Sequence, residues 1–429
     1  MSKKKDFGFS RTTRRMTLKD KRVLFISYNG MLDPLGQSQV IPYLRELSRI
    51  GLRFTLLSFE RDAAWDSEGV AKCEELKEQL NAYDIEWHRL RYHRRPSLPA
   101  TLYDVMAGTR FASQLVRKNR IEVVHARSHV PATIALNLKR RFPLKMIFDV
   151  RGLMAEEYMD AGHWREGSLK YRLTKRTERR LFAASDGVVT LTEAIWPLIK
   201  NWDGLGGRNV SHAVVPCCAD LERFRFDAEA RARRRAELQV EDKFVVVYSG
   251  SIGGWYMTGE MMDFFASLRA ADSRAHFLWL TTGAHDVVKS MMQARGIAEA
   301  DYTVRSASPA DVSSYLSASD AGMAFIKPCF SKLASSPTKT AEYLACGLPL
   351  ILNAGVGDSD VLATRERVGT LVHDFTSEEY ERAASEILKM AEDVEAKRAR
   401  TREVAERLFD VRGVGLERYA RLYEEVSRS

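Results

Sequence analysis

The sequence predicts an α/β protein made of two doubly wound, Rossmann-like domains. Three observations support this fold class. Short apolar runs of strand length alternate with helical patterns, the series starts again near residue 244, and 429 residues exceed what one ordinary core fills. Because the runs show no polar alternation, we expect parallel sheets covered by helices on both faces.

The first series opens with the apolar run 22–27, followed by a glycine-containing loop and a helix over 39–50. Pro216 ends the last strand, because proline cannot continue a hydrogen-bonded ladder. Strands are predicted between these limits at 54–59, 122–126, 145–150, 187–191 and 210–215.

The second series begins with strand 244–249, which runs into Gly250. After about residue 376 the pattern is helical, and its last part carries one apolar stripe with Tyr419 and Tyr423. Further strands are predicted at 276–280, 302–305, 321–326 and 349–353.

These two series set the expected domain boundaries. The chain should divide into a disordered basic tail (1–21), a first Rossmann-like domain (22–216), a hinge (217–242), a second Rossmann-like domain (243–405) and a terminal helix (406–429) that packs back toward the first domain.

The charge of the chain does not indicate a nucleic-acid partner. The net charge is +9, but residues 1–22 hold nine Lys or Arg against two Asp, so the remaining 407 residues carry only +2. The tail lacks an apolar core, and no run of eighteen apolar residues occurs, so neither a secretory signal nor an ordinary transmembrane helix is expected. The five cysteines form no CxxC pair and suit a reducing cytoplasm.

The segment 336–349 is the most informative motif. Ser336 is a good N-cap, Pro337 suits the first helical position, and Gly347 supplies a left-handed stop. Free N–H groups at such a helix start attract anions, and Lys339 would add a mobile positive charge. Glu342 follows three residues later on the same face, where it could accept bonds from two hydroxyls. The alternative is an ordinary capped helix with a solvated charge pair.

Loops at the carboxyl ends of the predicted strands carry further polar residues. Ligands of doubly wound sheets bind at these ends, so we expect the loops of both domains to face one inter-domain cleft. The loops are 33–39, 125–129, 149–152, 250–254 and 327–328.

With these motifs the chain resembles the retaining glycosyltransferases of family 4, which depend on sugar nucleotides and have the two-domain GT-B fold. The likeness spans about 22–429. It rests on Asp33-Pro34-Leu35-Gly36-Gln37-Ser38-Gln39, on 214–224, which resembles the family's hinge-entering motif, and on 336–349. The first domain would then bind the acceptor, and the second the nucleotide sugar.

The resemblance implies a donor site. Gly36 and Gln37 would approach the diphosphate from the first domain, and Glu342 would hold the nucleotide ribose. The helix start at Ser336, with Thr338 and Lys339, would face the phosphates. Gly250 and Ser251 would line the nucleotide pocket, although residues 250–254 alone also suit a tight strand-to-helix turn.

The chain departs from the family pattern at three places. Ala334 stands where many members have a second glutamate that contacts the donor sugar, so the sugar cannot be inferred. Trp255, Tyr256 and Met257 replace the usual Arg and Lys that neutralise the diphosphate. Arg127 takes the second position of a His-x-His pair, and a guanidinium cannot act as a base.

The largest expected catalytic contribution is positive charge of the protein placed beside the leaving diphosphate, and Lys327 and Lys339 are the candidates for supplying it. His125 would bond the donor sugar or the acceptor, or else be a satisfied structural group. Asp149 and Arg151 would bind the acceptor or pair with each other. No metal or other cofactor is expected, since Asp358-Ser359-Asp360 suits a turn better than a metal site.

The resulting hypothesis is a retaining hexosyltransferase that uses a UDP- or GDP-sugar in cell-surface polysaccharide or glycolipid biosynthesis. The acceptor would be a glycan or a lipid-linked sugar. Basic residues in 89–95 and 165–182, interleaved with apolar ones, could hold a cytoplasmic protein on the inner face of an anionic membrane, or could form a solvated helix face. A sugar-nucleotide epimerase and a non-catalytic nucleotide-sugar-binding protein are the alternatives.

Overall fold

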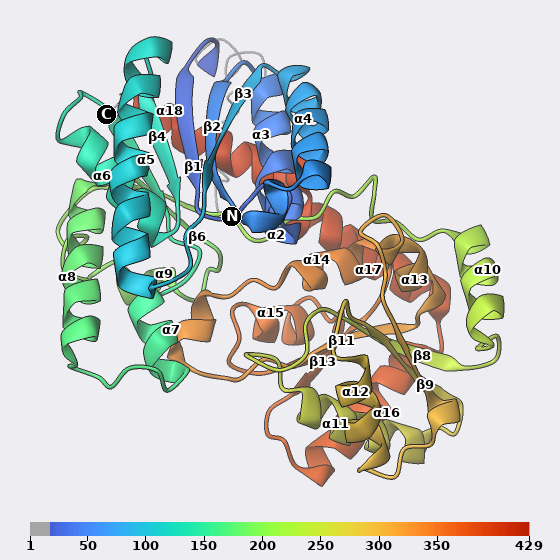
Figure 1. Cartoon of the computed structure of the whole chain (residues 1–429). Helices are drawn as coiled ribbons and strands as arrows, with labels where there is room; N and C mark the ends of the chain where they lie inside the picture. Colours follow the sequence, from blue (N-terminus) through green and yellow to red (C-terminus); the bar gives the residue numbers. More distant parts are fainter. Residues whose placement is uncertain (1–17, 429) are drawn as a thin grey trace, which may run out of the picture. The chain divides into compact units, whose positions relative to one another are not determined.

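The computed structural model describes residues 18–428 and divides them into two compact units (Figure 1). Unit 1 contains the described chain up to Thr190, the segment Trp196–Val215 and the chain from Gly415 onward. Unit 2 contains Leu191–Ile195 and Pro216–Val414. The predicted tail lies outside the described residues except for 18–21. There Leu18 is buried and the Asp20 N–H donates to the Gly51 carbonyl at 2.9 Å.

The described part of unit 1 contains a seven-stranded parallel sheet in the order β3-β2-β1-β4-β5-β6-β7. The predicted α/β fold class is confirmed. The strands are β1 (Arg22–Ser27), β2 (Arg53–Glu60), β3 (Ile85–Arg91), β4 (Val123–Arg127), β5 (Lys145–Asp149), β6 (Gly187–Thr190) and β7 (Ser211–Val214). Sequence reasoning missed β3, because only Ile85 and Trp87 of this edge strand are buried and most of its other positions are charged or polar.

Helices cover both faces of this sheet. They are α2 (Pro34–Gln39), α3 (Ile41–Arg49), α4 (Ser67–Asn81), α5 (Ser97–Asn119), α6 (His129–Lys139), α7 (Met154–Asp160), α8 (Leu169–Ala184), α9 (Trp196–Ile199) and α18 (Leu416–Arg428). The helix predicted over 39–50 is confirmed as α3, with its start two residues later, and the loop predicted before it contains the short helix α2. The chain leaves helical geometry at Val40, and Pro42 lacks the N–H that would continue the ladder.

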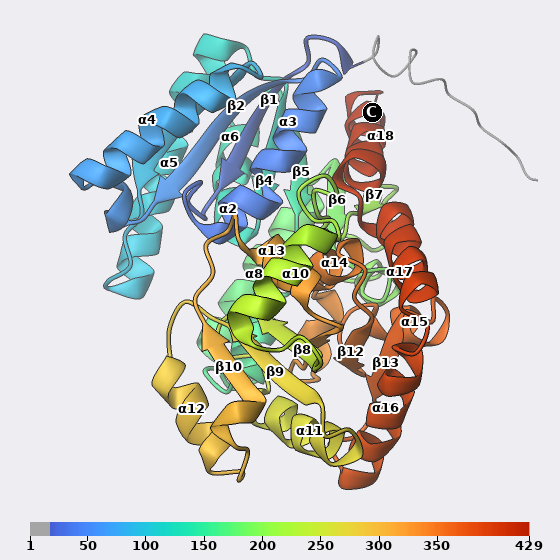
Figure 2. The ribbon, with the colours of Figure 1, turned by 90° about the vertical axis from the view of Figure 1, so that its right-hand side faces the viewer.

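Helices α5, α6 and α8 lie side by side on one face of the sheet (Figure 1). On the other face α18 lies beside α3 (Figure 2). The last helix of the described chain therefore completes the first unit. Its Tyr423 is buried, and a side chain at Gly187 would meet Val426 at 2.7 Å, so the strand and the helix pack directly.

Unit 2 contains a six-stranded parallel sheet among its described residues, in the order β10-β9-β8-β11-β12-β13. Its large buried side chains include Trp279, Phe264 and Phe265. The strands are β8 (Phe244–Ser249), β9 (Ala275–Leu280), β10 (Tyr302–Arg305), β11 (Ala321–Ala324), β12 (Leu350–Asn353) and β13 (Gly369–Val372). The helices are α10 (Ala228–Leu238), α11 (Thr258–Ala271), α12 (His285–Gln293), α13 (Val312–Ala318), α14 (Thr338–Ala345), α15 (Ser359–Thr364), α16 (Ser377–Met390) and α17 (Val394–Phe409).

Each sheet has one topological switch point. In unit 1 it lies between β1 and β4, and in unit 2 between β8 and β11, because the strand order runs outward in both directions from these pairs. Ligands of doubly wound sheets bind outside the carboxyl ends of the strands at this point. A ligand site is therefore expected in the loops after these four strands.

None of the described helices combines the length and the apolar character that a membrane-spanning segment needs.

Candidate functional site

The loop after β8 is held across the exit of β11. The Met257 N–H donates to the Phe325 carbonyl at 3.0 Å, and the Lys327 N–H donates to the Trp255 carbonyl at 2.9 Å. Tyr256 forms an antiparallel bridge with Ile326 between these bonds. The segment that contains Trp255 and Tyr256 is thereby fixed beside the switch point of unit 2, while the Lys327 side chain is exposed.

Helix α14 follows the β11 exit loop and starts at the same end of the sheet. Gly347 has a φ of +81°, which confirms the predicted left-handed stop. The predicted N-cap is wrong: Pro337 occupies the cap position and Thr338 is the first helical residue. Ser336 Oγ instead accepts a hydrogen bond from the Cys217 N–H at 3.1 Å, so it fastens the helix start to the chain that enters unit 2.

Lys339, in the first turn of α14, is buried between two tyrosine rings. Its Nζ lies 4.0 Å from the ring centroid of Tyr248 and 3.7 Å from that of Tyr256. The side chain was expected to be mobile, but the residue is only 6% exposed and its Nζ has no hydrogen-bond partner among the described residues. Burial disfavours the charged form and lowers the pKa of Lys339 to about 7.

Gly250 leaves the room that this ammonium group occupies. It has a φ of +152°, and a Cβ placed on it would lie 2.6 Å from Lys339 Nζ. The turn is also fixed by the Tyr248 hydroxyl, which donates to the Ser251 carbonyl at 2.6 Å. Glycine is therefore required here both for backbone conformation and for space around the lysine.

Glu342 lies one turn after Lys339. Burial raises the pKa of its carboxyl to about 7, against the opposing effects of Arg223 and Lys339. The structure thus brings Gly250, Ser251 and Lys339 together, with Glu342 on the same face of α14 and Ser336 and Thr338 at its start. An ammonium group without a partner, beside the first turn of a helix, can hold an anion.

In unit 1, Gly36 and Gln37 lie on α2 after the loop that leaves β1. A Cβ on Gly36 would lie 2.3 Å from the Gly30 carbonyl oxygen, and Gln37 Nε2 donates to the Met31 carbonyl at 2.7 Å. Both residues hold α2 against its own loop. Their predicted approach to a diphosphate stays a prediction.

His125 and Asp149 lie in the interior of unit 1. The Tyr423 hydroxyl lies 2.7 Å from His125 Nδ1, and the Tyr419 hydroxyl donates to Asp149 Oδ2 at 3.1 Å. Arg151 Nη1 is 3.8 Å from the same carboxylate. Burial alone would raise the pKa of Asp149, but Arg151, His125 and Arg127 hold it below its ordinary value. Burial lowers the pKa of His125.

This geometry favours the structural alternative for His125 and the mutual pairing of Asp149 with Arg151. Arg127 is also buried, and its Nη1 donates to Asn29 Oδ1 at 2.9 Å across the switch point. Sequence reasoning identified the tyrosine stripe of α18 but not its polar partners in β4 and β5, which lie almost 300 residues earlier in the chain.

The Asp-Ser-Asp segment opens helix α15 instead of forming a free turn. The carboxylate of Asp358 accepts the backbone N–H groups of Glu193 and Ala194, each at 3.0 Å. Sequence reasoning also missed Asn353, whose side-chain amide donates to the Ile326 carbonyl at 2.9 Å and accepts its N–H at 2.8 Å. This pair holds the β11 exit, and an asparagine at a strand end gives no distinctive signal.

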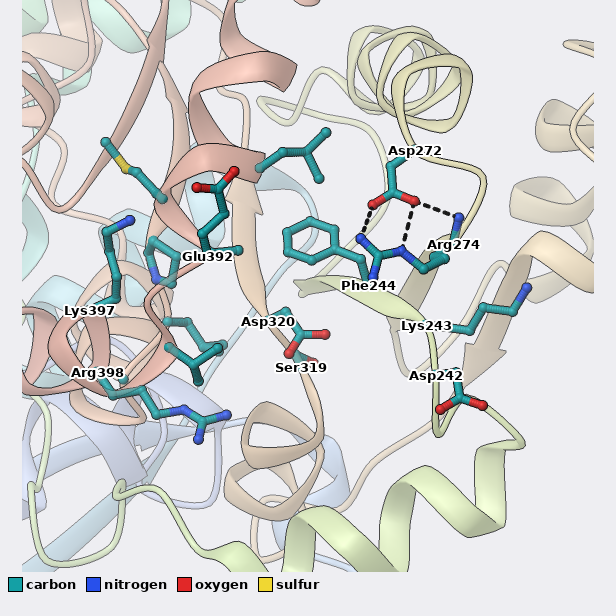
Figure 3. A pocket seen from close by; sticks show the side chains of 17 residues that line it. Asp242, Lys243, Phe244, Asp272, Arg274, Ser319, Asp320, Glu392, Lys397 and Arg398 are labelled. Carbon is teal, nitrogen blue, oxygen red and sulfur yellow. Dashed lines mark hydrogen bonds and ion pairs between the residues drawn. The ribbon is translucent and has the colours of Figure 1, made fainter.

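A pocket of about 480 Å³ lies at the opposite end of the unit 2 sheet (Figure 3). Its lining includes Lys243, Phe244 and Asp320, which stand at the amino ends of β8 and β11. Arg274 and Asp272 on its wall bond each other (Figure 3). Because ligands of doubly wound sheets bind at the carboxyl ends, this pocket is not the candidate site.

Comparisons with known proteins agree with this architecture. A family model described as the glycosyl transferase 4-like domain matches residues 42–218. No curated protein sequence matches the chain.

Solved structures match nearly the whole chain and show that it has the GT-B fold. Sucrose-phosphate synthase from Thermosynechococcus elongatus has a TM-score of 0.72 at 15% identity, covering 95% of this chain and 99% of that one. HepE of Anabaena in complex with UDP-glucose has a TM-score of 0.67 at 15% identity, with coverages of 95% and 100%. WaaG, a glycosyltransferase involved in lipopolysaccharide biosynthesis, has a TM-score of 0.65 at 14% identity, with coverages of 93% and 98%.

Proposed function

We propose that this protein is a glycosyltransferase that moves a sugar from a nucleotide-diphosphate sugar to an acceptor hydroxyl. One observation carries the proposal: the buried Lys339 ammonium has no hydrogen-bond partner among the described residues and lies at the helix start beside the unit 2 switch point. A diphosphate is the ligand that would complete this arrangement.

The chemistry of transfer gives this site a role. Breaking the bond between the anomeric carbon and the diphosphate leaves growing negative charge on the phosphate oxygens. Lys339 and the first turn of α14 would stabilise that charge without reorganising during the reaction. Burial lowers the pKa of Lys339 to about 7 in the free protein. A bound diphosphate would raise that pKa again, so the lysine would take up a proton when the ligand binds.

Glu342 would accept hydrogen bonds from the nucleotide ribose. It lies on the same face of α14 as Lys339, one helical turn further on, and its carboxyl group is largely buried. A nucleoside diphosphate extending from this carboxylate to the helix start would pass Gly250. The absence of a Cβ there leaves space for Lys339 Nζ, whose ammonium group would meet the phosphates.

The finer features of the reaction are part of the same proposal. The crystal structures of HepE with UDP and UDP-glucose support a UDP-sugar, with a GDP-sugar as the other candidate donor. WaaG supports a role in cell-surface polysaccharide or glycolipid biosynthesis. We further propose hexosyl transfer with retention to a glycan or lipid-linked acceptor, without a metal, by a cytoplasmic protein at the inner face of the membrane.

Calorimetric titration with UDP and GDP tests donor binding, and incubation with labelled UDP- and GDP-sugars, with and without a lipid extract, tests turnover. We expect binding by the native protein, loss of binding in Lys339→Gln, and no change in Lys289→Gln, whose side chain is exposed on α12. Transfer should persist in EDTA.

Three outcomes would contradict the proposal. Conversion of the donor alone would indicate an epimerase, and saturable binding without turnover would indicate a binding protein. No nucleotide binding at millimolar concentration by the folded protein would remove the site assignment itself.

A further inference from the structure

The outer face of α5 exposes large apolar side chains. Leu98, Leu102 and Met106 follow one another at four-residue spacing and are 68%, 56% and 68% exposed. Tyr103 lies beside them and is 55% exposed. A ladder of this spacing forms one continuous stripe along a helix.

The inner face of the same helix carries small and polar residues. Ala100, Asp104, Gly108 and Ala112 are buried there. A Cβ on Gly108 would lie 2.7 Å from Ile134 Cδ1, so α5 packs closely on α6 and only small side chains fit between them. This packing explains the buried face, but it does not explain the three exposed apolar side chains on the opposite face. A contiguous apolar patch is disfavoured on the surface of a soluble protein.

The exposed charges of the stretch that carries this stripe have one sign. Between residues 87 and 121 the only carboxylate is Asp104, which is buried and bonded to the Tyr28 hydroxyl at 2.7 Å and to the His93 ring at 2.6 Å. The exposed basic residues of this stretch include Arg94 and Arg95 before the helix, and Arg110 one turn beyond Met106.

A groove of about 530 Å³ between α5 and α6 continues the stripe. Arg110, Arg117 and Arg141 line it together with hydroxyl and amide side chains, and its lining contains no acidic residue. Met106 lies at one end, so the apolar ladder leads directly into a groove suited to phosphate groups.

We propose that the outer face of α5 docks on an anionic lipid surface. Leu98, Leu102 and Met106 enter the boundary between headgroups and acyl chains, and the arginines of the groove bind the lipid phosphates. Helix α5 spans 23 residues, about 34 Å at the usual rise, which is enough to lie along the surface.

Other occupants of this face are disfavoured by charge. A second copy of the chain that docked on this face would bring the arginines beside the stripe against their own copies. Residues 1–17 hold six Lys or Arg and one Asp, so they repel the stripe as well. Helix α8, the lipid-facing candidate from sequence, exposes Leu169 and Leu173, but the ammonium group of Lys175 is already paired with Glu156 and Glu178.

Flotation of the full-length protein with vesicles tests the proposal. We expect binding to vesicles of phosphatidylcholine mixed with phosphatidylglycerol and little binding to phosphatidylcholine alone. The combined substitution Leu98→Ser, Leu102→Ser and Met106→Ser should weaken partitioning about thirtyfold or more, since it removes three apolar chains from the interface. Arg110→Gln or Arg141→Gln should each weaken it about fivefold.

The matched control is Leu169→Ser with Leu173→Ser on α8, which should leave partitioning within about twofold of the native protein. All variants retain residues 1–17, so a loss specific to the α5 variants belongs to α5. Because the assay contains no donor, its result is independent of the proposed transfer reaction.

Two results would overturn the inference. One is equal flotation of the folded triple variant and the native protein. The other is sedimentation showing that the native chain self-associates through this face and that the triple variant does not, which would assign the stripe to a second copy. Preserved melting temperature in the triple variant establishes that a loss of binding is not a loss of fold.

Discussion

Replacing Lys339 by methionine should stabilise unit 2 while weakening nucleotide binding. Methionine fills nearly the same volume between the rings of Tyr248 and Tyr256 but brings no charge into the interior. The pKa of the buried lysine falls from 10.5 to about 7. At about 1.4 kcal/mol per pKa unit, the buried charge therefore destabilises the folded protein by roughly 5 kcal/mol below pH 7.

Part of this gain is offset by the loss of the attraction between the ammonium and two aromatic rings, about 1–2 kcal/mol. A net increase of about 3–4 kcal/mol in the free energy of unfolding should raise the melting temperature of unit 2 by about 6–16 °C. The advantage of methionine should shrink as the pH rises from 7 to 10.5. Over that range the folded lysine is neutral and the unfolded lysine is still protonated, so the native protein gains stability with pH.

Scanning calorimetry measures the stability change, and titration calorimetry with UDP measures the functional one. Losing a bond between the ammonium and the diphosphate should weaken UDP binding about 10- to 100-fold. Lys289→Met, an exposed control on α12, should change neither quantity. The reasoning is refuted if the Lys339→Met protein melts below the native protein, or if it binds UDP within twofold of the native affinity.

Three further predictions concern the two units. Gly250→Ala should cost about 1–3 kcal/mol of stability, because residue 250 has a φ of +152°, and it should abolish UDP binding, because the new Cβ would displace Lys339 Nζ. The control Gly283→Ala, whose Cβ would meet nothing within 4 Å, should change neither stability nor UDP binding. UDP binding should be about tenfold weaker at pH 8 than at pH 6, since Lys339 with a pKa of about 7 must be protonated to hold the diphosphate; titration in buffers of different ionisation enthalpy should detect proton uptake, and a pH-independent affinity would contradict this. Tyr419→Phe should destabilise unit 1 by about 1–3 kcal/mol, because it removes a hydrogen bond to the buried Asp149; an unchanged melting temperature would argue against it.

The parallel sheets and the stop of α14 could be predicted because their signals are local. Gly347 marks its own left-handed position, and runs such as 244–249 identify buried strands without reference to the rest of the chain. The helix predicted over 39–50 is local in the same sense, and α3 lies within it. Edge strand β3 escaped detection because half of its residues face away from the core.

The state of the site residues could not be predicted, because it depends on distant partners. Lys339 is buried by tyrosines that precede it by more than 80 residues, so its sequence neighbours suggested a solvated charge. His125 meets the hydroxyl of Tyr423, 298 residues later. Such pairings follow from the way the whole chain folds back, and no spacing within a motif reports them.

The return of α18 to unit 1 has a consequence for biosynthesis. Tyr419, Tyr423 and Val426 supply part of the interior of the first unit, yet the ribosome adds them only after the second unit has been made. Unit 2 can therefore fold while unit 1 is still incomplete, because one face of the unit 1 sheet stays partly uncovered until α18 has been synthesised. Removing residues from Gly415 onward should leave that apolar surface open, so such truncated chains should need chaperones and aggregate even though they retain all thirteen strands described here.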